Sequence, residues 1–185
     1  MSFVIVDNGS KYTQALQKLL FHEKPLVIHY KNLDYKKLSR GDIVILTGGH
    51  GDPILWHKKE YTPEIDLIKK HKGPIIGICL GFELIAHVYK SHLHLRNDRR
   101  KGEITLIGTS KSPIIIPTKV SVYENHNWSV LKLKRPLVPL AYSKDGVEIM
   151  KHARKPIYGI QFHPEESSSA GASVFSEIIS KVTNG

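Results

Sequence analysis

The fold is decided by Pro74-Ile75-Ile76-Gly77-Ile78-Cys79-Leu80-Gly81, where a strand gives way to a helix. The apolar run that ends at Ile78 is typical of a buried strand, and the pattern of residues 82–89 predicts a helix. Cys79 therefore falls at a sharp turn, with one glycine two residues before it and another two residues after it. This arrangement is a nucleophile elbow in which cysteine replaces serine. Glycine fits both positions because a side chain at either one would crowd the turn.

The first half of the chain alternates strands with helices on both sides of this turn. Strands are expected over 3–6, 26–29, 43–46 and 75–78, and helices over 12–21, 62–71 and 82–89. This alternation indicates a parallel sheet with helices on both faces. Functional residues of such sheets lie beyond the carboxyl ends of the strands. Cys79 and the glycine-rich segment 47–53 both follow predicted strands, so we expect them to meet at one edge.

The second half is richer in short strands. They are expected over 104–107, 114–116, 120–123, 137–142, 147–152 and 157–162, followed by a final helix over 170–182. Asp145-Gly146 predicts a hairpin turn between two of these strands. Together the patterns predict a three-layer α/β fold with a flavodoxin-like, mostly parallel sheet and an antiparallel extension. No linker interrupts the chain, so we expect residues 1–185 to form a single domain.

A nucleophilic cysteine needs a base, and the base needs a group that orients it. Gly159-Ile160-Gln161-Phe162-His163-Pro164-Glu165 supplies both, because a rigid turn after a strand can aim His163 at Cys79 and Glu165 at His163. A helix N-terminus and a nearby imidazole both favour the thiolate. We therefore expect Cys79 to be a partly exposed thiol with a low pKa.

Composition narrows the classes of function. The 185 residues carry a net charge of +10 and include a single cysteine, which argues against a disulfide or a structural zinc site and fits a reducing compartment. The sequence has no apolar run of membrane-spanning length and no features of a signal peptide, so we expect a cytoplasmic protein without a membrane partner. Basic runs such as 96–101 are not interleaved with aromatic residues, which argues against nucleic acid. Such a run is solvated surface, or a binding site for an acidic protein partner or a phosphorylated ligand.

These segments, in this order, resemble those of class I glutamine amidotransferases of the triad type, over essentially the whole chain. The resemblance implies that Cys79 attacks the side-chain amide of glutamine, that His163 acts as general base and acid, and that Glu165 orients His163. It also implies that this attack releases ammonia and leaves a glutamyl thioester, which water then hydrolyses to glutamate, with no cofactor and no metal ion.

The resemblance also assigns residues around the substrate. The oxyanion would be held by the backbone N–H of Leu80 and by one from the glycine turn, and such donors contribute a few kcal/mol each in the transition state. The oxyanion and substrate-binding residues implied in this way are Gly48, Gly49, Gly51, Leu80, Glu83, His126 and Asn127.

Within this family the chain is most similar to the separate amidotransferase subunits of archaeal-type GMP synthases. The similarity lies in Val4-Ile5-Val6-Asp7-Asn8-Gly9, Val122-Tyr123-Glu124-Asn125-His126 and Glu148-Ile149-Met150-Lys151-His152. It implies that the ammonia passes to an ATP-dependent synthetase, a partner that aminates xanthosine monophosphate.

Three segments depart from the family: Phe82-Glu83, Gly49-His50-Gly51 in place of Gly-Gly-Pro, and Asn127-Trp128 in place of Gly-Asp after His126. The first of them leaves other functions open. The family has His-Gln after Cys-Leu-Gly, and this chain has Phe82-Glu83. A carboxylate at Glu83 would pair with the ammonium group of glutamine but repel its α-carboxylate. One alternative is therefore a hydrolase of the same fold that acts on another γ-glutamyl or amide substrate. A second alternative is a catalytically weak member that binds or regulates a partner through its basic surface.

Overall fold

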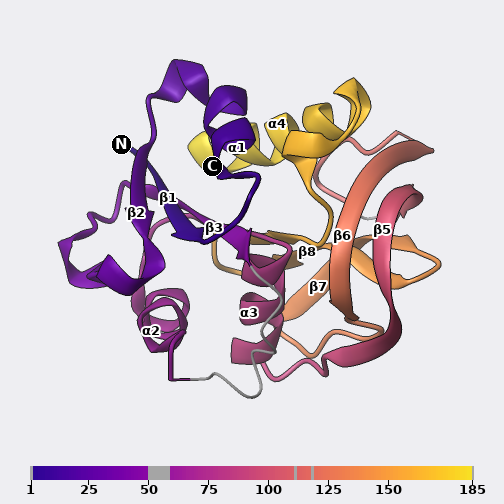
Figure 1. Cartoon of the computed structure of the whole chain (residues 1–185), viewed down its shortest axis with the longest axis horizontal. Coiled ribbons are helices and arrows are strands. Elements are labelled where there is room, and N and C mark those ends of the chain that lie inside the picture. Colours follow the sequence, from indigo (N-terminus) through magenta and orange to yellow (C-terminus); the bar gives the residue numbers. More distant parts are fainter. Residues whose placement is uncertain (1, 50–58, 111, 118, 185) are drawn as a thin grey trace.

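The computed structural model describes residues 2–49, 59–110, 112–117 and 119–184. Its strands join into one nine-stranded sheet with the order β2-β1-β3-β4-β9-β8-β7-β5-β6 (Figure 1). The strands are β1 (Phe3–Asn8), β2 (Leu26–His29), β3 (Ile43–Gly49), β4 (Ile75–Ile78), β5 (His94–Gly108), β6 (Val120–Ser129), β7 (Leu137–Ser143), β8 (Gly146–His152) and β9 (Ile157–Ile160). The α-helices are α1 (Thr13–Leu19), α2 (Thr62–Lys70), α3 (Leu80–Val88) and α4 (Ser169–Thr183), and short 3₁₀ turns span Phe21–Glu23, Tyr30–Asn32, Tyr35–Lys37 and Pro164–Glu166.

The five strands β2, β1, β3, β4 and β9 pair in parallel, and all of them except the edge strand β2 are buried on both faces. Alternate residues of one strand point to opposite faces, and β3 shows the consequence. Ile43 and Ile45 pack in the apolar cluster that includes residues of α1 and α4. Val44 and Leu46 pack in the cluster that includes residues of α2 and α3. Continuous apolar runs are typical of such doubly covered strands, and this confirms the predicted α/β fold.

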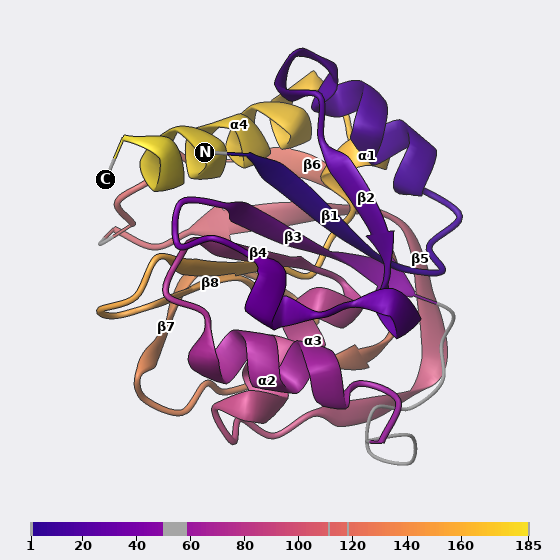
Figure 2. The same ribbon diagram turned by 90° about the vertical axis from the view of Figure 1, so that its left-hand side faces the viewer.

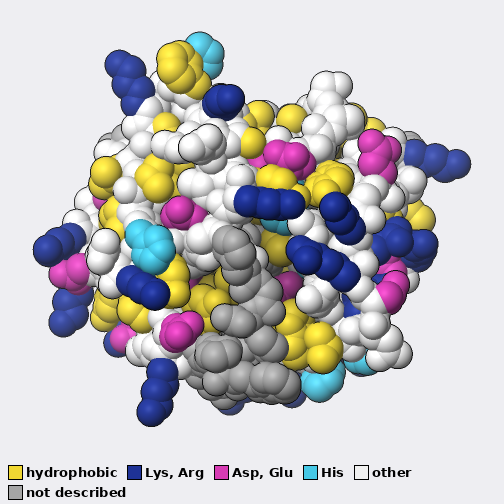
Figure 3. Space-filling model, viewed as in Figure 1, with side chains coloured by type: hydrophobic (Ala, Val, Ile, Leu, Met, Phe, Trp, Pro, Cys, Tyr) yellow, Lys and Arg dark blue, Asp and Glu magenta, His cyan; other side chains and the backbone are white. Residues whose placement is uncertain are grey.

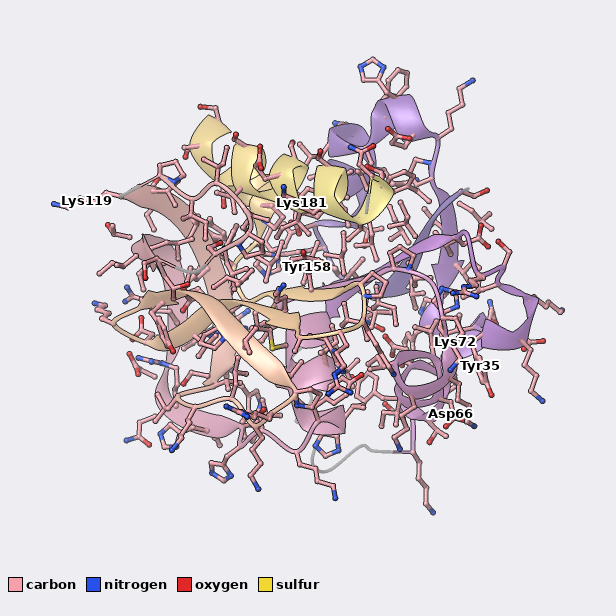
Figure 4. The ribbon with its side chains drawn as sticks, turned by 180° about the vertical axis from the view of Figure 1, so that it is seen from behind. Tyr35, Asp66, Lys72, Lys119, Tyr158 and Lys181 are labelled. Carbon is pink, nitrogen blue, oxygen red and sulfur yellow. The ribbon has the colours of Figure 1, made fainter. Side chains whose placement is uncertain are left out.

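The three layers are visible when the molecule is turned on its side, with α1 and α4 on one face of the sheet and α2 and α3 on the other (Figure 2). From behind, Tyr158 of β9 lies below α4, whereas Tyr35 lies close to Asp66 of α2 (Figure 4). Tyr158 is buried in the same cluster as the apolar side of α4.

The antiparallel extension consists of β8, β7, β5 and β6, each paired antiparallel to its neighbours in the sheet. The predicted hairpin before β8 is present, but its turn lies one residue earlier than expected: Ser143 pairs with Gly146, so Lys144 and Asp145 form the turn, and Gly146 begins β8 with a φ of 136° that suits glycine. The strand expected over 104–107 is much longer, because β5 starts at His94. The strand expected over 114–116 is wrong: this stretch lies between Pro113 and Pro117 and forms no ladder.

The order of the parallel strands brings the candidate residues together. Since Ile78 of β4 is the register partner of Ile160 of β9, the segments that leave these two strands begin side by side. Cys79 directly follows β4, and His163 follows β9 three residues after its end. The carboxyl ends of β1 and β3 lie at the same edge, where Asn8 pairs with Gly49. None of the described helices is both long enough and apolar enough to cross a membrane.

Candidate active site

The elbow at Cys79 has the strained backbone of a nucleophile turn. Cys79 caps the N-terminus of α3 with φ 50° and ψ −103°, and its N–H donates to the carbonyl of Ile160 at 2.8 Å. A Cβ added to Gly77 would lie 2.4 Å from the backbone of Gly81, and one added to Gly81 would lie 2.4 Å from the carbonyl oxygen of Leu46. Both glycines are therefore required by close approach of the backbone. Strain of this kind at a strand-to-helix turn is typical of catalytic residues.

His163 is fixed by contacts of both its backbone and its side chain. Its backbone N–H donates to the carbonyl of Tyr123 at 2.8 Å, which ties the segment after β9 to β6. Its Nδ1 lies 2.9 Å from Oε1 of Glu165, and both side chains are almost completely buried. Because Nδ1 donates to the carboxylate, Nε2 is the ring nitrogen left to accept a proton. The i, i+2 spacing across Pro164 therefore produces the geometry expected of an imidazole and the group that orients it.

Gly48 shows how close the cysteine and the histidine lie. A Cβ on Gly48 would be 2.9 Å from Cε1 of His163, 3.8 Å from its Nε2 and 3.4 Å from Cβ of Cys79. The two side chains therefore meet over this glycine, at the end of β3. The ring of Tyr12 packs edge-on against the other side of His163, with ring centroids 4.7 Å apart.

A cavity of about 220 Å³ opens beside these residues. Its lining includes most of the residues expected from the sequence, namely Gly49, Cys79, Leu80, Glu83, His126, Asn127 and His163. Gly48 and Glu165 do not line it and lie behind the wall, against His163. Gly51 lies outside the described residues, so its expected role stays a prediction. The remaining lining residues are Gly9, Ser10, Lys11, Tyr12, Arg99, Asn125 and Trp128.

The expectation of a partly exposed cysteine with a low pKa is wrong for this structure. Cys79 is buried, and burial raises the pKa of its thiol well above the usual range, with further contributions from the charges of Glu83 and Glu165. The backbone N–H of Leu80 opposes this by hydrogen bonding to the thiolate. The thiol instead donates to the carbonyl of Asn125 at 3.8 Å. Sequence reasoning considered the local helix N-terminus and missed the burial, which depends on the tertiary fold.

Glu83 lies on the first turn of α3, four residues after Cys79, and is 4 % exposed. Nε2 of Gln161 donates to its Oε1 at 3.2 Å. Burial raises the pKa of Glu83 from 4.5 to about 7, although His126 and Gln161 favour the ionised form. Near neutral pH the side chain is thus close to its titration midpoint, and in its protonated form it is neutral, like the glutamine that the family has here.

Behind His126 lies a buried network of charged groups. Nδ1 of His126 donates to the carbonyl of Trp128 at 2.6 Å, and its Nε2 lies 3.5 Å from Glu124. Burial raises the pKa of Glu148 well above its usual range, and the charge of Glu124 adds to this, so Glu148 keeps its proton. Burial also disfavours the charge on Glu124, but hydrogen bonds, first that from His126, outweigh it and lower the pKa. This network fixes His126 in the cavity wall.

Among the lining residues that sequence reasoning did not assign to the site, Tyr12, Arg99 and Asn125 are linked by hydrogen bonds. Nδ2 of Asn125 donates to the hydroxyl of Tyr12 at 3.0 Å, and Nε of Arg99 donates to Oδ1 of Asn125 at 2.9 Å. Asn125 stands next to His126 in a segment that the resemblance had already singled out, and this was the available signal. Arg99 was hidden in a basic run that looked like solvated surface.

The described part of the chain contains no group of three or more His, Cys, Asp or Glu side chains placed to hold a metal ion. What the site does contain is a cysteine on a strained elbow, a histidine tied to a carboxylate and a backbone N–H beside the sulfur. This set matches the requirements of nucleophilic attack on an acyl carbon.

Comparison with known proteins identifies the family. The model of the class I glutamine amidotransferase family matches residues 4–180 of this chain. The chain is a class I glutamine amidotransferase.

Individual relatives show which members of this family the chain is similar to. This amidotransferase is 32% identical over 169 residues to a glutamine-hydrolysing GMP synthase subunit from Pyrococcus furiosus, covering 88% of each protein. It is 30% identical over 164 residues to the GMP synthase of Thermotoga maritima, of which it spans only 32% of the length. A solved structure from Thermoplasma acidophilum, described as a candidate subunit of GMP synthase, superimposes with a TM-score of 0.87 at 25% identity and covers all of this chain and 94% of the other.

Proposed function

We propose that this amidotransferase hydrolyses the side-chain amide of glutamine through Cys79, His163 and Glu165. Nε2 of His163 takes the proton of the thiol while the sulfur attacks the amide carbon. His163 then passes this proton to the departing nitrogen, so that ammonia leaves and a glutamyl thioester remains. Water attacks the thioester with His163 again as base, which releases glutamate and restores the thiol.

Two further roles follow from the geometry of the site. We assign the oxyanion of each tetrahedral intermediate to the backbone N–H of Leu80, whose hydrogen bond to the sulfur lowers the pKa of Cys79. Glu165 holds the ring of His163 with Nε2 free, because its carboxylate occupies Nδ1. The observation that carries the proposal is the meeting of a buried His163–Glu165 pair with Cys79 on a strained elbow.

The raised pKa of Cys79 defines how the reaction starts. The resting nucleophile is a neutral thiol rather than a preformed thiolate. Proton transfer therefore accompanies attack on the amide, and the enzyme depends on His163 as a general base. A neutral resting thiol also reacts slowly with other electrophiles, because the thiolate is the reactive form.

The ammonia is proposed to serve a separate synthetase that forms GMP from xanthosine monophosphate with ATP. Two facts support this partner. The chain covers most of the length of the GMP synthase subunit from Pyrococcus furiosus. It also corresponds to about a third of the length of the longer GMP synthase of Thermotoga maritima.

The test is to mix this chain with the candidate synthetase of the same organism and to supply either glutamine or an ammonium salt. Nucleotide formation from glutamine is expected to need both chains, whereas formation from ammonium needs the synthetase alone. Cys79→Ala should abolish the first reaction and leave the second unchanged. If the mixture released glutamate but made no GMP from glutamine, the synthetase assignment would be refuted and the glutaminase assignment retained.

A further inference from the structure

The bulge in β5 directs one arginine towards the cavity. The pairing of β5 with β6 shifts register between Leu95 and Arg100. Nη1 of Arg96 lies 2.8 Å from Oδ1 of Asp145, and Nε of Arg100 lies 3.0 Å from Oδ2 of the same carboxylate, which is buried. The two ends of the bulged segment are therefore fixed by one buried anion. Bulges of this kind re-aim the side chains between their ends.

Arg99 is the residue that this geometry turns to the mouth of the cavity. It lines the cavity together with Cys79, and its Nε donates to Oδ1 of Asn125 at 2.9 Å. Asn125 is itself fixed, because its Nδ2 donates to Tyr12 and its carbonyl accepts from the Cys79 thiol. The Arg99 guanidinium is thus oriented by the same residue that contacts the nucleophile. Its two terminal nitrogens have no hydrogen-bond or ion-pair partner among the described residues.

Because carboxyl groups lie close to Cys79, an anionic group of a substrate needs a cationic partner in the cavity. The carboxyl groups of Glu83 in the cavity lining and of Glu165 and Glu124, which are buried behind it, all raise the pKa of Cys79, so negative charge beside the sulfur is disfavoured. On the described lining, the cationic side chains are Lys11 and Arg99. Nζ of Lys11 sits over the ring of Tyr12, 4.7 Å from its centroid. Lys and Arg side chains gather on this face between α1 and strands β5 and β6 (Figure 3).

We propose that Arg99 binds the α-carboxylate of the substrate whose side-chain amide reaches Cys79. This inference rests on the proposed function and makes the site specific for a free α-amino acid. A guanidinium offers two parallel N–H donors that match a carboxylate, and such charge-assisted pairs are stronger than neutral hydrogen bonds. The bond from Nε to Asn125 leaves that fork available and holds it in one orientation. Arg99 also offsets the repulsion that Glu83 would exert on the α-carboxylate.

The test compares glutamine with its α-amide, in which the carboxylate is neutral, with the synthetase present. Arg99→Gln and Arg99→Met are measured beside Lys101→Gln, a control that removes the same charge from an exposed neighbour in β5 that does not line the cavity. Both Arg99 variants are expected to raise KM for glutamine about tenfold, the usual effect of losing one charged hydrogen bond. Their kcat should stay within about twofold, and their KM for the α-amide should not change. Lys101→Gln should resemble the wild type on both substrates.

Two results would overturn the assignment. One is an unchanged KM for glutamine in both Arg99 variants. The other is an equal loss on glutamine and on the α-amide, which would mean that Arg99 only positions Asn125. Thermal unfolding of each variant excludes a general loss of structure. The proposed function fails separately, if the wild-type chain with its synthetase releases no glutamate from glutamine at all.

Discussion

Replacement of Glu83 by glutamine should stabilise the protein, and by an amount that depends on pH. Burial raises the pKa of Glu83 from 4.5 to about 7. Each pKa unit corresponds to about 1.4 kcal/mol, so ionising this side chain costs the folded state about 3 kcal/mol more than it costs the unfolded chain. Glutamine has nearly the same shape, stays neutral and therefore avoids this cost.

The direction of this pH dependence follows from proton binding in the folded and unfolded states. Between pH 4.5 and about 7 the folded protein holds the proton of Glu83 while the unfolded chain has lost it. Stability from this group therefore falls as pH rises through that window and is constant above it. The difference in unfolding free energy between Glu83→Gln and the wild type should be near zero at pH 4.5, should grow through pH 7 and should level off at about 3 kcal/mol by pH 8.5.

The assay is urea unfolding of both proteins at four pH values from 4.5 to 8.5. Because other titrating groups are common to both proteins, their effects cancel in the difference. Glu64→Gln is a matched control. Burial raises the pKa of Glu64 to about 8, and this residue lies on α2 and does not line the cavity. Both variants should gain stability at high pH, but only Glu83→Gln should change glutamine kinetics. A stability difference that is the same at every pH would refute this reasoning.

The same titration should appear in catalysis. Wild-type KM for glutamine is expected to rise as pH passes through about 7, because ionised Glu83 adds negative charge to the wall that faces the α-carboxylate. In Glu83→Gln this dependence should vanish, with KM at pH 8 below that of the wild type. If KM of the wild type instead fell as Glu83 ionised, the carboxylate would be pairing with the substrate ammonium.

Other changes test the remaining parts of the site. Cys79→Ala and His163→Ala should each abolish glutamate release, because nucleophile and base act as a unit. Glu165→Gln should leave measurable activity. Near-normal thioester formation by His163→Ala in a single turnover would contradict the triad. Alkylation of Cys79 by iodoacetamide should show a midpoint above about 8.5, the value of a free thiol, and a lower midpoint would mean that a thiolate is preformed. Gly48→Ala should lower kcat at least about tenfold with little loss of stability, because its Cβ would lie 2.9 Å from Cε1 of His163; unchanged turnover would show that the ring can move without cost.

The parallel half of the fold could be predicted from sequence because its signals are local. Short apolar runs and the glycines on each side of Cys79 define strands and turn without knowledge of their partners. The length of β5 could not be predicted, because its first half is a charged run held in the sheet by ion pairs to Asp145 and Glu124. Ile114 and its neighbours have strand composition, but the prolines on both sides prevent a ladder.

The same contrast between local and long-range signals applies to the residues of the site. Cys79, His163 and Glu165 stand in short motifs whose geometry is set within a few residues, so their roles could be inferred from spacing. Arg99 could not, because its direction depends on a bulge between β5 and β6 and on the partners of its neighbours. The pKa of Cys79 was missed for a similar reason, since the thiol is buried by segments far away in the sequence, among them that of Asn125.

The most direct test of the proposed chemistry is to trap the acyl-enzyme. The chain and its synthetase are mixed with glutamine, quenched with acid during turnover, digested and analysed by mass spectrometry. A glutamyl adduct is expected on the peptide that contains Cys79, present in the wild type and absent in Cys79→Ala, which should also release no glutamate. Glutamate release that continues in Cys79→Ala, with no adduct in the wild type, would contradict covalent catalysis by this cysteine.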